Sequence, residues 1–277
     1  MACRPQPGSL RWRLTVPRGE VVGVGIAVGV IGGSGGVGAS TFAAVLAWAA
    51  RGTLVDLDPW GGGIDVLLGI EAVPGARWSG VRVGGGRLDP ALLSAGLPRW
   101  AGVPVLAVDR SPPAGGVGEV LAAVAELGCT VLDLPRAPSP AREAALEECG
   151  LVVVLAHAGV RQLSAARAVV SALPDVNVGT VLRRGEVPLG DAVPLVGAAL
   201  LGVLPRPAGG LPLGRGRPPR SLARVAAGIV DGLGRDGLGR DGLGRDGLGR
   251  DGLGRDGLVG PGAESAARAS VGAAGLP

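Results

Sequence analysis

Eight residues near the start of the chain have the spacing of a phosphate-binding loop. Residues 33–40 read GSGGVGAS, which fits the template G-x-x-x-x-G-K-[ST] except that Ala39 takes the place of the lysine. Such a loop binds phosphate through main-chain N–H groups at the amino end of the helix that follows. The sequence therefore predicts an anion-binding loop without its ammonium group. The residues expected to contact the ligand are Gly33, Ser34, Gly35, Gly36, Val37, Gly38, Ala39, Ser40 and Thr41.

The same glycines also fit a second pattern. Gly33, Gly35 and Gly38 follow G-x-G-x-x-G, and Asp56 comes eighteen residues after the last of them. This is the arrangement of loops that bind a dinucleotide such as NAD. A glycine turn without any ligand is a third interpretation. The loop alone does not choose among a nucleoside triphosphate, NAD and no ligand.

Hydroxyl and carboxyl groups favour a nucleotide with magnesium. Ser40 and Thr41 follow the last glycine, where a magnesium-binding hydroxyl is required. Asp56 and Asp58 end one apolar run, and Asp133 ends another, VLDLP, in the form of a Walker B strand. A lone aspartate is more often a turn residue, so the three together carry this interpretation. The pattern predicts that Ser40 and Asp133 lie near a magnesium ion, with Asp56 and Asp58 at the same edge of the sheet.

Strand-like and helix-like segments alternate along most of the chain. Apolar, β-branched runs predict strands at 21–31, 53–56, 103–108, 130–135, 151–156, 178–182 and 201–204. Predicted helices occupy 40–50, 64–68, 117–127, 140–148, 160–173, 192–200 and 221–233. The alternation predicts an α/β fold, a doubly wound and mostly parallel sheet with helices on both faces. Ligands bind such sheets at the carboxyl ends of the strands, where the loop and the aspartates are expected.

The composition divides the chain into three parts. We expect a flexible segment at 1–20, an α/β domain at 21–233 and a low-complexity, disordered tail at 234–277. DGLGR occurs five times in tandem over 231–255. Two glycines and one leucine in every five residues favour neither a helix nor a core. Calcium-binding β-rolls share G-x-G-x-D, but their repeats have nine residues.

The overall composition argues against several classes of protein. The formal net charge of +4 is modest and does not by itself indicate nucleic-acid binding. Cys3, Cys129 and Cys149 are odd in number and lack C-x-x-C spacing, which argues against a disulfide framework or a zinc site. His157 is the only histidine, so a Ser-His-Asp triad is not expected.

The uncharged segment 21–50 resembles a signal peptide or a membrane helix in its hydropathy. The run Gly-Gly-Ser-Gly-Gly at 32–36 would break a spanning helix in its middle. A strand, a glycine loop and a buried helix explain the same residues. We therefore predict no membrane span and a cytoplasmic protein.

Three segments in this order resemble the MinD/ParA group of P-loop proteins: GGSGGVGASTFA, TLVDLDPWGGGIDVLLG and VLDLP. The resemblance spans residues 21–233. It points most closely to the CpaE-like branch found beside pilus and secretion genes, including the septum-site-determining (Ssd) proteins of actinobacteria. RWSGVRVGGGRLDPALLSAGLP and VPVLAVDR also look like that branch. Its members usually carry a receiver-like domain before the loop, which we expect to be missing here.

The resemblance implies a nucleotide-responsive regulatory protein that binds ATP or ADP with Mg²⁺. It makes Asp56 a magnesium ligand together with Ser40 and Asp133. It also gives Asp56 and Asp58 catalytic roles, with Asp58 positioning the attacking water. It also implies a homodimer across the nucleotide, and division, pilus or secretion proteins as partners. The protein would help to place a septum or a pilus or secretion apparatus, at the membrane or septum only through those partners.

The departures from the family pattern concern two lysines. The signature lysine that reaches a partner's nucleotide is replaced by Ser34, and the phosphate-binding lysine by Ala39; the chain has no lysine at all. Losing one charge-assisted hydrogen bond costs about 1.5–3 kcal/mol, or about 10- to 150-fold in affinity. We expect weak nucleotide binding and weak or absent hydrolysis. Arg136, or the pair Arg183 and Arg184, are the candidates to replace the lost charge.

Two other functions stay open at this stage. One is an active ATPase that uses arginine in place of the lysine, and the other is a Rossmann-type NAD oxidoreductase. The stretch from Arg206 to Arg224 carries five arginines without an acid. It predicts either a solvated loop or contact with an anionic partner such as a nucleotide, DNA or lipid headgroups. The resemblance to ParA proteins implies non-specific DNA binding through such arginines. The tail lacks the apolar face of the membrane helix that ends MinD proteins.

Overall fold

A computed structural model describes residues 25–83, 87–109, 116–206, 213 and 216–237, with side chains described up to residue 234. All of them belong to one structural unit. The strands are β1 Ala27–Gly32, β2 Thr53–Asp56, β3 Arg99–Trp100, β4 Val103–Leu106, β5 Thr130–Leu134, β6 Cys149–His157, β7 Val178–Arg183 and β8 Ala199–Leu204. The helices are α1 Ala39–Ala50, α2 Ile64–Leu68, the 3-10 turn η1 Trp78–Gly80, α3 Pro90–Gly96, α4 Val117–Ala125, α5 Pro140–Glu148, α6 Val160–Ser171, α7 Leu189–Val196 and α8 Arg220–Gly237.

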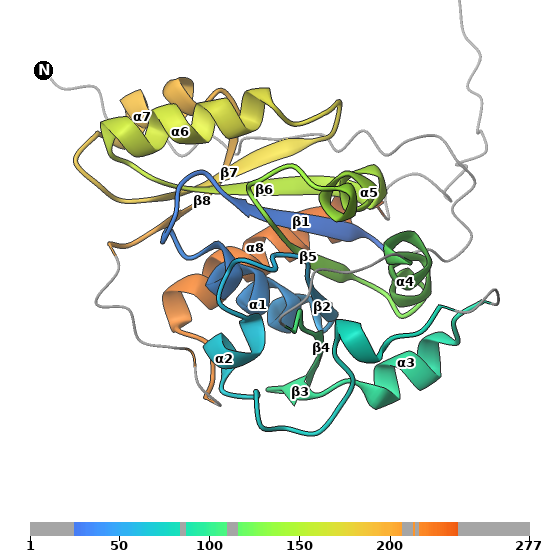
Figure 1. Ribbon diagram of the computed structural model, residues 1–277. Coiled ribbons are helices and arrows are strands. Elements are labelled where there is room, and N and C mark those ends of the chain that lie inside the picture. Colours follow the sequence, from blue (N-terminus) through green and yellow to red (C-terminus); the bar gives the residue numbers. More distant parts are fainter. Residues whose placement is uncertain (1–24, 84–86, 110–115, 207–212, 214–215, 238–277) are drawn as a thin grey trace, which may run out of the picture. The chain divides into compact units, whose positions relative to one another are not determined.

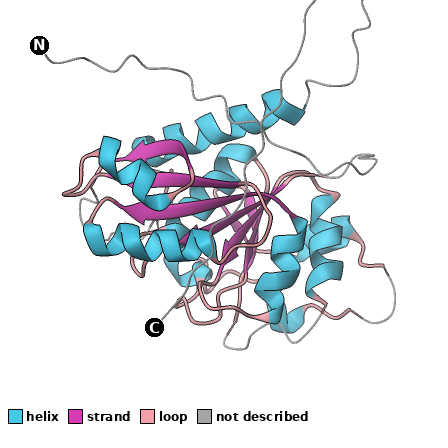
Figure 2. Cartoon of the chain, turned by 90° about the horizontal axis from the view of Figure 1, so that it is seen from above, coloured by secondary structure: helices cyan, strands magenta, loops and turns pink. Residues whose placement is uncertain are grey.

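The strands form one sheet in the order β3-β4-β2-β5-β1-β6-β7-β8 (Figure 1). Every pairing is parallel except that of β3 with β4. The view in Figure 2 shows helices on both faces of the sheet. This is the predicted doubly wound, mostly parallel α/β fold, and the expectation is confirmed.

Each face of the sheet has its own hydrophobic core. On one face α1 and α8 pack together, and Phe42 and Leu46 of α1 belong to the same core as Ile229 and Leu233 of α8. On the other face α4, α5, α6 and α7 cover the sheet through residues such as Leu163. The central strands are apolar along their whole length because both of their faces are covered; all six residues of β1 are buried.

Most predicted elements agree with the structure to within two residues at each end, and 53–56, 64–68 and 140–148 agree fully. Pro140 begins α5 behind the capping hydroxyl of Ser139, which accepts from the Arg142 N–H. Local capping residues therefore fix helix starts that the sequence pattern already indicates.

Four predicted boundaries differ from the structure by more than two residues: the start of β1, both ends of α7 and the end of α8. Strand β1 begins at Ala27 rather than Val21, and residues 21–24 lie outside the described part of the chain. The predicted helix 192–200 is α7 at 189–196, because Gly197 adopts a left-handed φ of 78° and ends it; β8 then starts at Ala199 rather than 201.

Helix α8 runs past Leu233, where we expected it to end, to Gly237. Leu222, Ala226, Ile229 and Leu233 are buried along one side of it, and this packing carries the helix through the first DGLGR copy despite its glycines. The hairpin of β3 and β4 was not predicted. Its tight turn uses left-handed φ values of 47° at Ala101 and 91° at Gly102.

Within the described residues, no helix is long and apolar enough to cross a membrane. The strand order places β2, β5 and β1 side by side. Their carboxyl ends therefore meet at one edge of the sheet, and the loops that follow them lie together there.

One close backbone approach at the start of β2 gives a test of the packing. A Cβ on Gly52 would lie 2.1 Å from the carbonyl oxygen of Cys129, which accepts the Thr53 N–H that aligns β2 with β5. We expect Gly52→Ala to lower the free energy of unfolding by about 1–3 kcal/mol. Gly118 lies on the exposed side of α4, and a Cβ there would meet no atom within 4 Å. Gly118→Ala should therefore raise the free energy of unfolding by about 0.5–1 kcal/mol. Urea denaturation of both variants measures this, and a neutral Gly52→Ala contradicts it.

Candidate phosphate-binding site

The glycine loop connects β1 to α1 and is fixed by its neighbours. The Gly33 N–H donates to the Leu155 carbonyl of β6 at 2.8 Å, and a Cβ on Gly33 would lie 2.6 Å from the Cβ of Ala166 in α6. Gly36 and Gly38 have left-handed φ values of 70° and 89°. The positions that the template reserves for glycine are therefore required by packing and by backbone conformation.

The amino end of α1 is free to bind an anion. Gly38 caps the helix without a side-chain hydrogen bond, and its first turn contains no acidic residue. The first N–H groups of a helix lack partners within the helix and carry its positive dipole end. No carboxylate of α1 competes for this end of the helix.

A cavity of about 440 Å³ opens above this loop. Every residue predicted to bind nucleotide, to act in catalysis or to hold metal lines it, except Gly33. Trp60, Gly61, Gly63, Ile64, Leu67, Leu134 and Arg136 complete the wall, together with Gly32. The volume is in the range of small-molecule sites.

Asp56 is buried at the end of β2, with only 2% of its surface exposed. Its carboxylate accepts N–H groups from Asp58 at 3.0 Å, Ile64 at 3.2 Å and Val108 at 3.4 Å. Burial raises the pKa of Asp56 to about 7; the three N–H donors pull it down, and the nearby charge of Asp58 adds a small rise. A counter-cation at this carboxylate would offset its burial.

Asp133 lies directly beside Asp56, because the two residues are register partners on β5 and β2. It is 3% exposed and accepts a hydrogen bond from the Ser40 hydroxyl. Burial raises the pKa of Asp133 well above its ordinary value; the charge of Asp56 raises it further, and the Ser40 hydrogen bond lowers it. The predicted metal ligands Ser40, Asp56 and Asp133 are therefore brought together.

Ser40, Asp56 and Asp133 could supply part of the ligand shell of a magnesium ion. Among the described residues no group of three or more His, Cys, Asp or Glu side chains forms a complete metal cage. Mg²⁺ is usually held by one or two carboxylates, with water and phosphate oxygens completing its shell. Two neighbouring carboxylates and a hydroxyl beside an anion-binding loop have this chemistry.

Asp58 lies on the loop between β2 and α2 rather than in the buried pair. Its carboxylate accepts the Trp60 N–H at 3.0 Å. Trp60 itself is 84% exposed at the mouth of the cavity. The sequence analysis did not predict that Trp60 lines the site. The sequence feature that could have indicated it is the rarity of aromatic residues, since the chain has only five Trp and one Phe.

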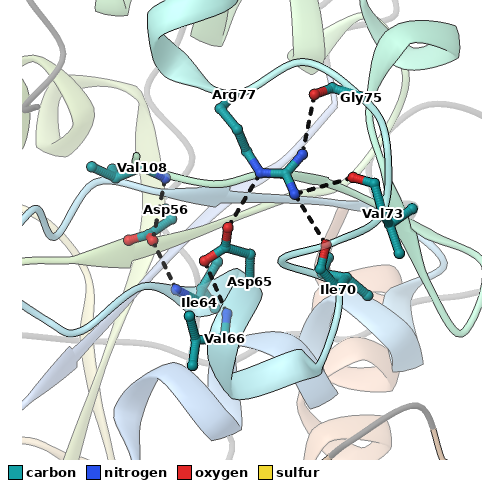
Figure 3. Close-up of polar contacts among 9 residues, drawn as sticks. All are labelled: Asp56, Ile64, Asp65, Val66, Ile70, Val73, Gly75, Arg77 and Val108. Carbon is teal, nitrogen blue, oxygen red and sulfur yellow. Dashed lines mark hydrogen bonds and ion pairs between the residues drawn. The ribbon is translucent and has the colours of Figure 1, made fainter. Parts of the chain in front are cut away.

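A clasp formed by Arg77 and Trp78 holds the surroundings of Asp56, and Figure 3 shows the contacts of Arg77. Arg77 pairs with Asp65 of α2 at 3.3 Å and donates to the carbonyls of Ile70, Val73 and Gly75. The indole N–H of the adjacent Trp78 donates to the Asp56 carbonyl at 2.7 Å. The helix that supplies the Ile64 N–H and the main chain of Asp56 are thus fixed by two consecutive residues. These residues begin the segment RWSGVRVGGG quoted above, but the sequence indicated no role for them.

The candidate arginines lie in different places. Arg136 lines the cavity, with its Nη2 atom 3.7 Å from the position of a Cβ on Gly35. Arg183 is buried and donates its Nε–H to the Val37 carbonyl at 2.8 Å. Arg184 is exposed and does not line the cavity. In the basic stretch, Arg206, Arg217, Arg220 and Arg224 are exposed, and Arg215 lies outside the described residues.

The raised pKa of Asp56 predicts that the ligand-free protein loses stability as pH rises from about 4 to 7. Over this range the folded state holds a proton that the unfolded chain has released, so the wild type should lose about 1.4 kcal/mol per pH unit from this group. Asp56→Asn removes this contribution. We expect its stability relative to wild type to rise between pH 4 and 7 and then to level off. Urea denaturation in EDTA at each pH measures the free energy of unfolding of both proteins. A difference between them that does not change with pH contradicts the prediction.

The clasp predicts unequal effects of two arginine substitutions. Arg77→Gln leaves the partly buried Asp65 and several carbonyls without their cation, so we expect a loss of about 3 kcal/mol in stability. Arg87→Gln removes the exposed pair with Glu126 and should change little. Guanidinium chloride denaturation of both variants measures this. Equal losses would show that the clasp adds nothing beyond an ordinary surface ion pair.

Comparison with known proteins places this site in a familiar fold. No family model matches the chain. Uncharacterized proteins from two strains of Mycobacterium tuberculosis, H37Rv and CDC 1551, are each 41% identical to it over 224 residues. The match covers 74% of this chain and 64% of each relative, so the chain spans less than two thirds of their length.

Solved structures of ParA and MinD proteins share the arrangement at low sequence identity. A ParA family ATPase from Chlorobium tepidum has a TM-score of 0.64 and 15% identity, over 76% of this chain and 99% of that one. The cell division ATPase MinD of Pyrococcus furiosus has 0.57 and 19%, over 76% and 99%. MinD of Pyrococcus horikoshii, solved with Mg-ADP, has 0.53 and 17%, over 75% and 95%. The described part of the chain therefore has the fold of the ParA and MinD ATPases.

Proposed function

We propose that this chain is a nucleotide-binding regulatory protein of the MinD/ParA family, which binds ATP or ADP with Mg²⁺ weakly and hydrolyses ATP slowly or not at all. The observation that carries the proposal is a juxtaposition in one cavity. An uncapped helix end at Gly38 faces it together with two buried carboxylates, Asp56 and Asp133, and the Ser40 hydroxyl. The anion site and the cation site are neighbours, as Mg-nucleotide binding requires.

The residues would divide the work as follows. The main-chain N–H groups of residues 34–40 bind phosphate oxygens, and Ser40, Asp56 and Asp133 hold the metal directly or through water. When bound, the metal neutralises phosphate charge. Asp58 sits on the loop at the cavity wall, where it orients a water molecule. The clasp of Arg77 and Trp78 keeps Asp56 in place.

Slow hydrolysis follows from the groups that are missing. Charge develops on the transferred phosphoryl group in the transition state, and cations close to it supply much of the catalysis. Ser34 and Ala39 occupy the two lysine positions, and neither side chain is charged. Loss of these groups lowers catalysis more than binding, so a protein that reports nucleotide occupancy fits the site better than an efficient ATPase.

The cellular role belongs to the same proposal. The order of GGSGGVGASTFA, TLVDLDPWGGGIDVLLG and VLDLP supports a CpaE/Ssd-like role in septum-site determination or in placing a pilus or secretion apparatus. Its partners would be a second copy of the chain across the nucleotide and proteins of those assemblies. The protein would act in the cytoplasm and reach the membrane or septum through partners. The exposed arginines between Arg206 and Arg224 support non-specific DNA contact.

A second candidate is an ATPase that uses arginine in place of lysine. Arg136 favours it, because its side chain lines the cavity beside Gly35. On this alternative, Arg136→Gln and Asp58→Ala would each abolish phosphate release by the purified protein with ATP and Mg²⁺. Release no greater than that of buffer in the wild type would end this candidate and leave the regulatory one.

Calorimetric titration of ATP and ADP, with and without Mg²⁺, tests the main proposal. We expect weak binding by the wild type and binding about 10- to 150-fold tighter by Ala39→Lys, because the ammonium group restores a charge-assisted hydrogen bond. Ser40→Ala should remove most of the Mg²⁺ dependence and leave Mg-free binding in place. Binding of NAD with no binding of ATP or ADP would overturn the proposal in favour of an oxidoreductase.

A further inference from the structure

Arg183 is a buried guanidinium group at the back of the phosphate-binding loop. It ends β7 and is only 7% exposed. Its Nε–H donates to the Val37 carbonyl at 2.8 Å, across 146 positions of sequence. Its Nη2 atom lies 3.0 Å from the position that a Cβ on Gly38 would take. The guanidinium therefore contacts the loop where α1 begins.

Nothing among the described residues neutralises this charge. The ion pairs of Arg77 with Asp65 and of Arg87 with Glu126 do not involve Arg183, which has no carboxylate partner among the described residues. Burial lowers the pKa of Arg183 from its ordinary value, which means that its environment disfavours the charged form. A buried cation without a counter-ion is costly unless an anion comes close to it.

The nearest anion site is the loop that Arg183 contacts. A cation hydrogen-bonded to the Val37 carbonyl polarises the Val37–Gly38 peptide and makes the Gly38 N–H a stronger donor. The positive charge also acts on a bound phosphate through a short path of low dielectric. Both effects add to the dipole of α1, whose amino end begins immediately after Gly38.

We propose that Arg183 is the resident cation of this loop: it binds the loop from behind and replaces, through the main chain, part of the attraction for phosphate that the two missing lysines would supply. This inference rests on the proposed nucleotide binding and extends it to a positioning residue. Arg136 and Arg183 then have separate roles. Arg136 lines the cavity and meets the ligand directly, whereas Arg183 does not line it and acts through Val37 and Gly38.

The residue types at both positions fit this role. An arginine offers a planar group with an Nε donor and two further nitrogens, so it can hold a carbonyl and keep its charge beside the loop. Gly38 has a left-handed φ of 89° and no side chain, which leaves room for the guanidinium. A larger residue at 38 would be strained and would also push Arg183 away.

The neighbouring Arg184 provides a matched control, because it is exposed and its substitution makes the same change in net charge. The experiment measures the affinity of ADP and of inorganic pyrophosphate by calorimetry for wild type, Arg183→Gln and Arg184→Gln. We expect Arg183→Gln to bind both ligands about 10-fold more weakly. Arg184→Gln should remain within about 2-fold of wild type, since exposed charges are screened.

A rescue variant separates an electrostatic role from a purely structural one. If Arg183 supplies attraction for phosphate, Ala39→Lys in the Arg183→Gln background should restore affinity at least to that of the wild type. A loop that has merely lost its shape would gain little from the lysine. A double variant that stays as weak as Arg183→Gln therefore overturns the inference.

The remaining outcomes are also decisive. No binding of ADP or pyrophosphate by the wild type would defeat the proposed function itself. Binding by the wild type with equal affinities for Arg183→Gln and Arg184→Gln would defeat only the role of Arg183.

If Arg183→Gln does not fold, NMR of the wild type decides instead. The signal to follow is the Arg183 Nε–H resonance, which is assigned by its absence in Arg183→Lys. It should shift on adding pyrophosphate, and an unmoved resonance overturns the inference.

Discussion

Two carboxylates buried side by side dominate the energetics of this site. Asp56 and Asp133 end neighbouring parallel strands, and the register of β2 with β5 leaves them no freedom to separate. Burying two like charges is unfavourable, and the structure offsets it only in part, with three N–H donors to Asp56 and one hydroxyl to Asp133. The raised pKa values of both groups express the remaining imbalance. A cation between the two carboxylates would remove this imbalance, which is the physical basis of the metal site proposed above.

The loop between β1 and α1 has the opposite imbalance, because its positive groups have no anionic partner within the described part of the chain. The loop has an uncapped helix end, and a buried guanidinium at Arg183 contacts it from behind. Both features favour an anion. A loop of this class normally carries a lysine at this position, and Ala39 supplies no charge there. The arginines of β7 and of the segment after β5 approach from two sides instead of from the loop itself.

The sequence predicted the parts of this arrangement that depend on local pattern. Buried strands read as apolar, β-branched runs, and the glycines of 33–38 read as a loop because their spacing reflects backbone conformations that other residues rarely adopt. The aspartates at strand ends could be placed at one edge because parallel strands share their direction. This is why nearly all predicted site residues line the cavity.

The parts that failed depend on contacts between distant segments. Whether Arg136, Arg183 or Arg184 approaches the loop is decided by the direction of side chains at the ends of β5 and β7, and no spacing encodes it. The clasp of Arg77 and Trp78 joins a segment without periodicity to the strand that carries Asp56. Helix α8 extends beyond its predicted end at residue 233. Its packing against α1 stabilises it by more than the glycines of its last turn destabilise it.

Metal and phosphate binding should depend on each other more strongly here than in a loop that has its lysine. A lysine neutralises phosphate before any metal arrives, so either ligand can bind first. Without it, a bound phosphate would face Asp56 and Asp133 with Arg136 at the cavity wall and Arg183 behind the main chain of the loop, and repulsion from the carboxylates would oppose it. A divalent cation between the two removes that repulsion and gives the carboxylates their counter-ion. An ammonium group would attract phosphate and repel Mg²⁺, so its absence weakens binding of phosphate alone more than binding of the Mg-nucleotide as a unit. On the proposed function, this difference favours a response to the nucleotide over a response to free phosphate.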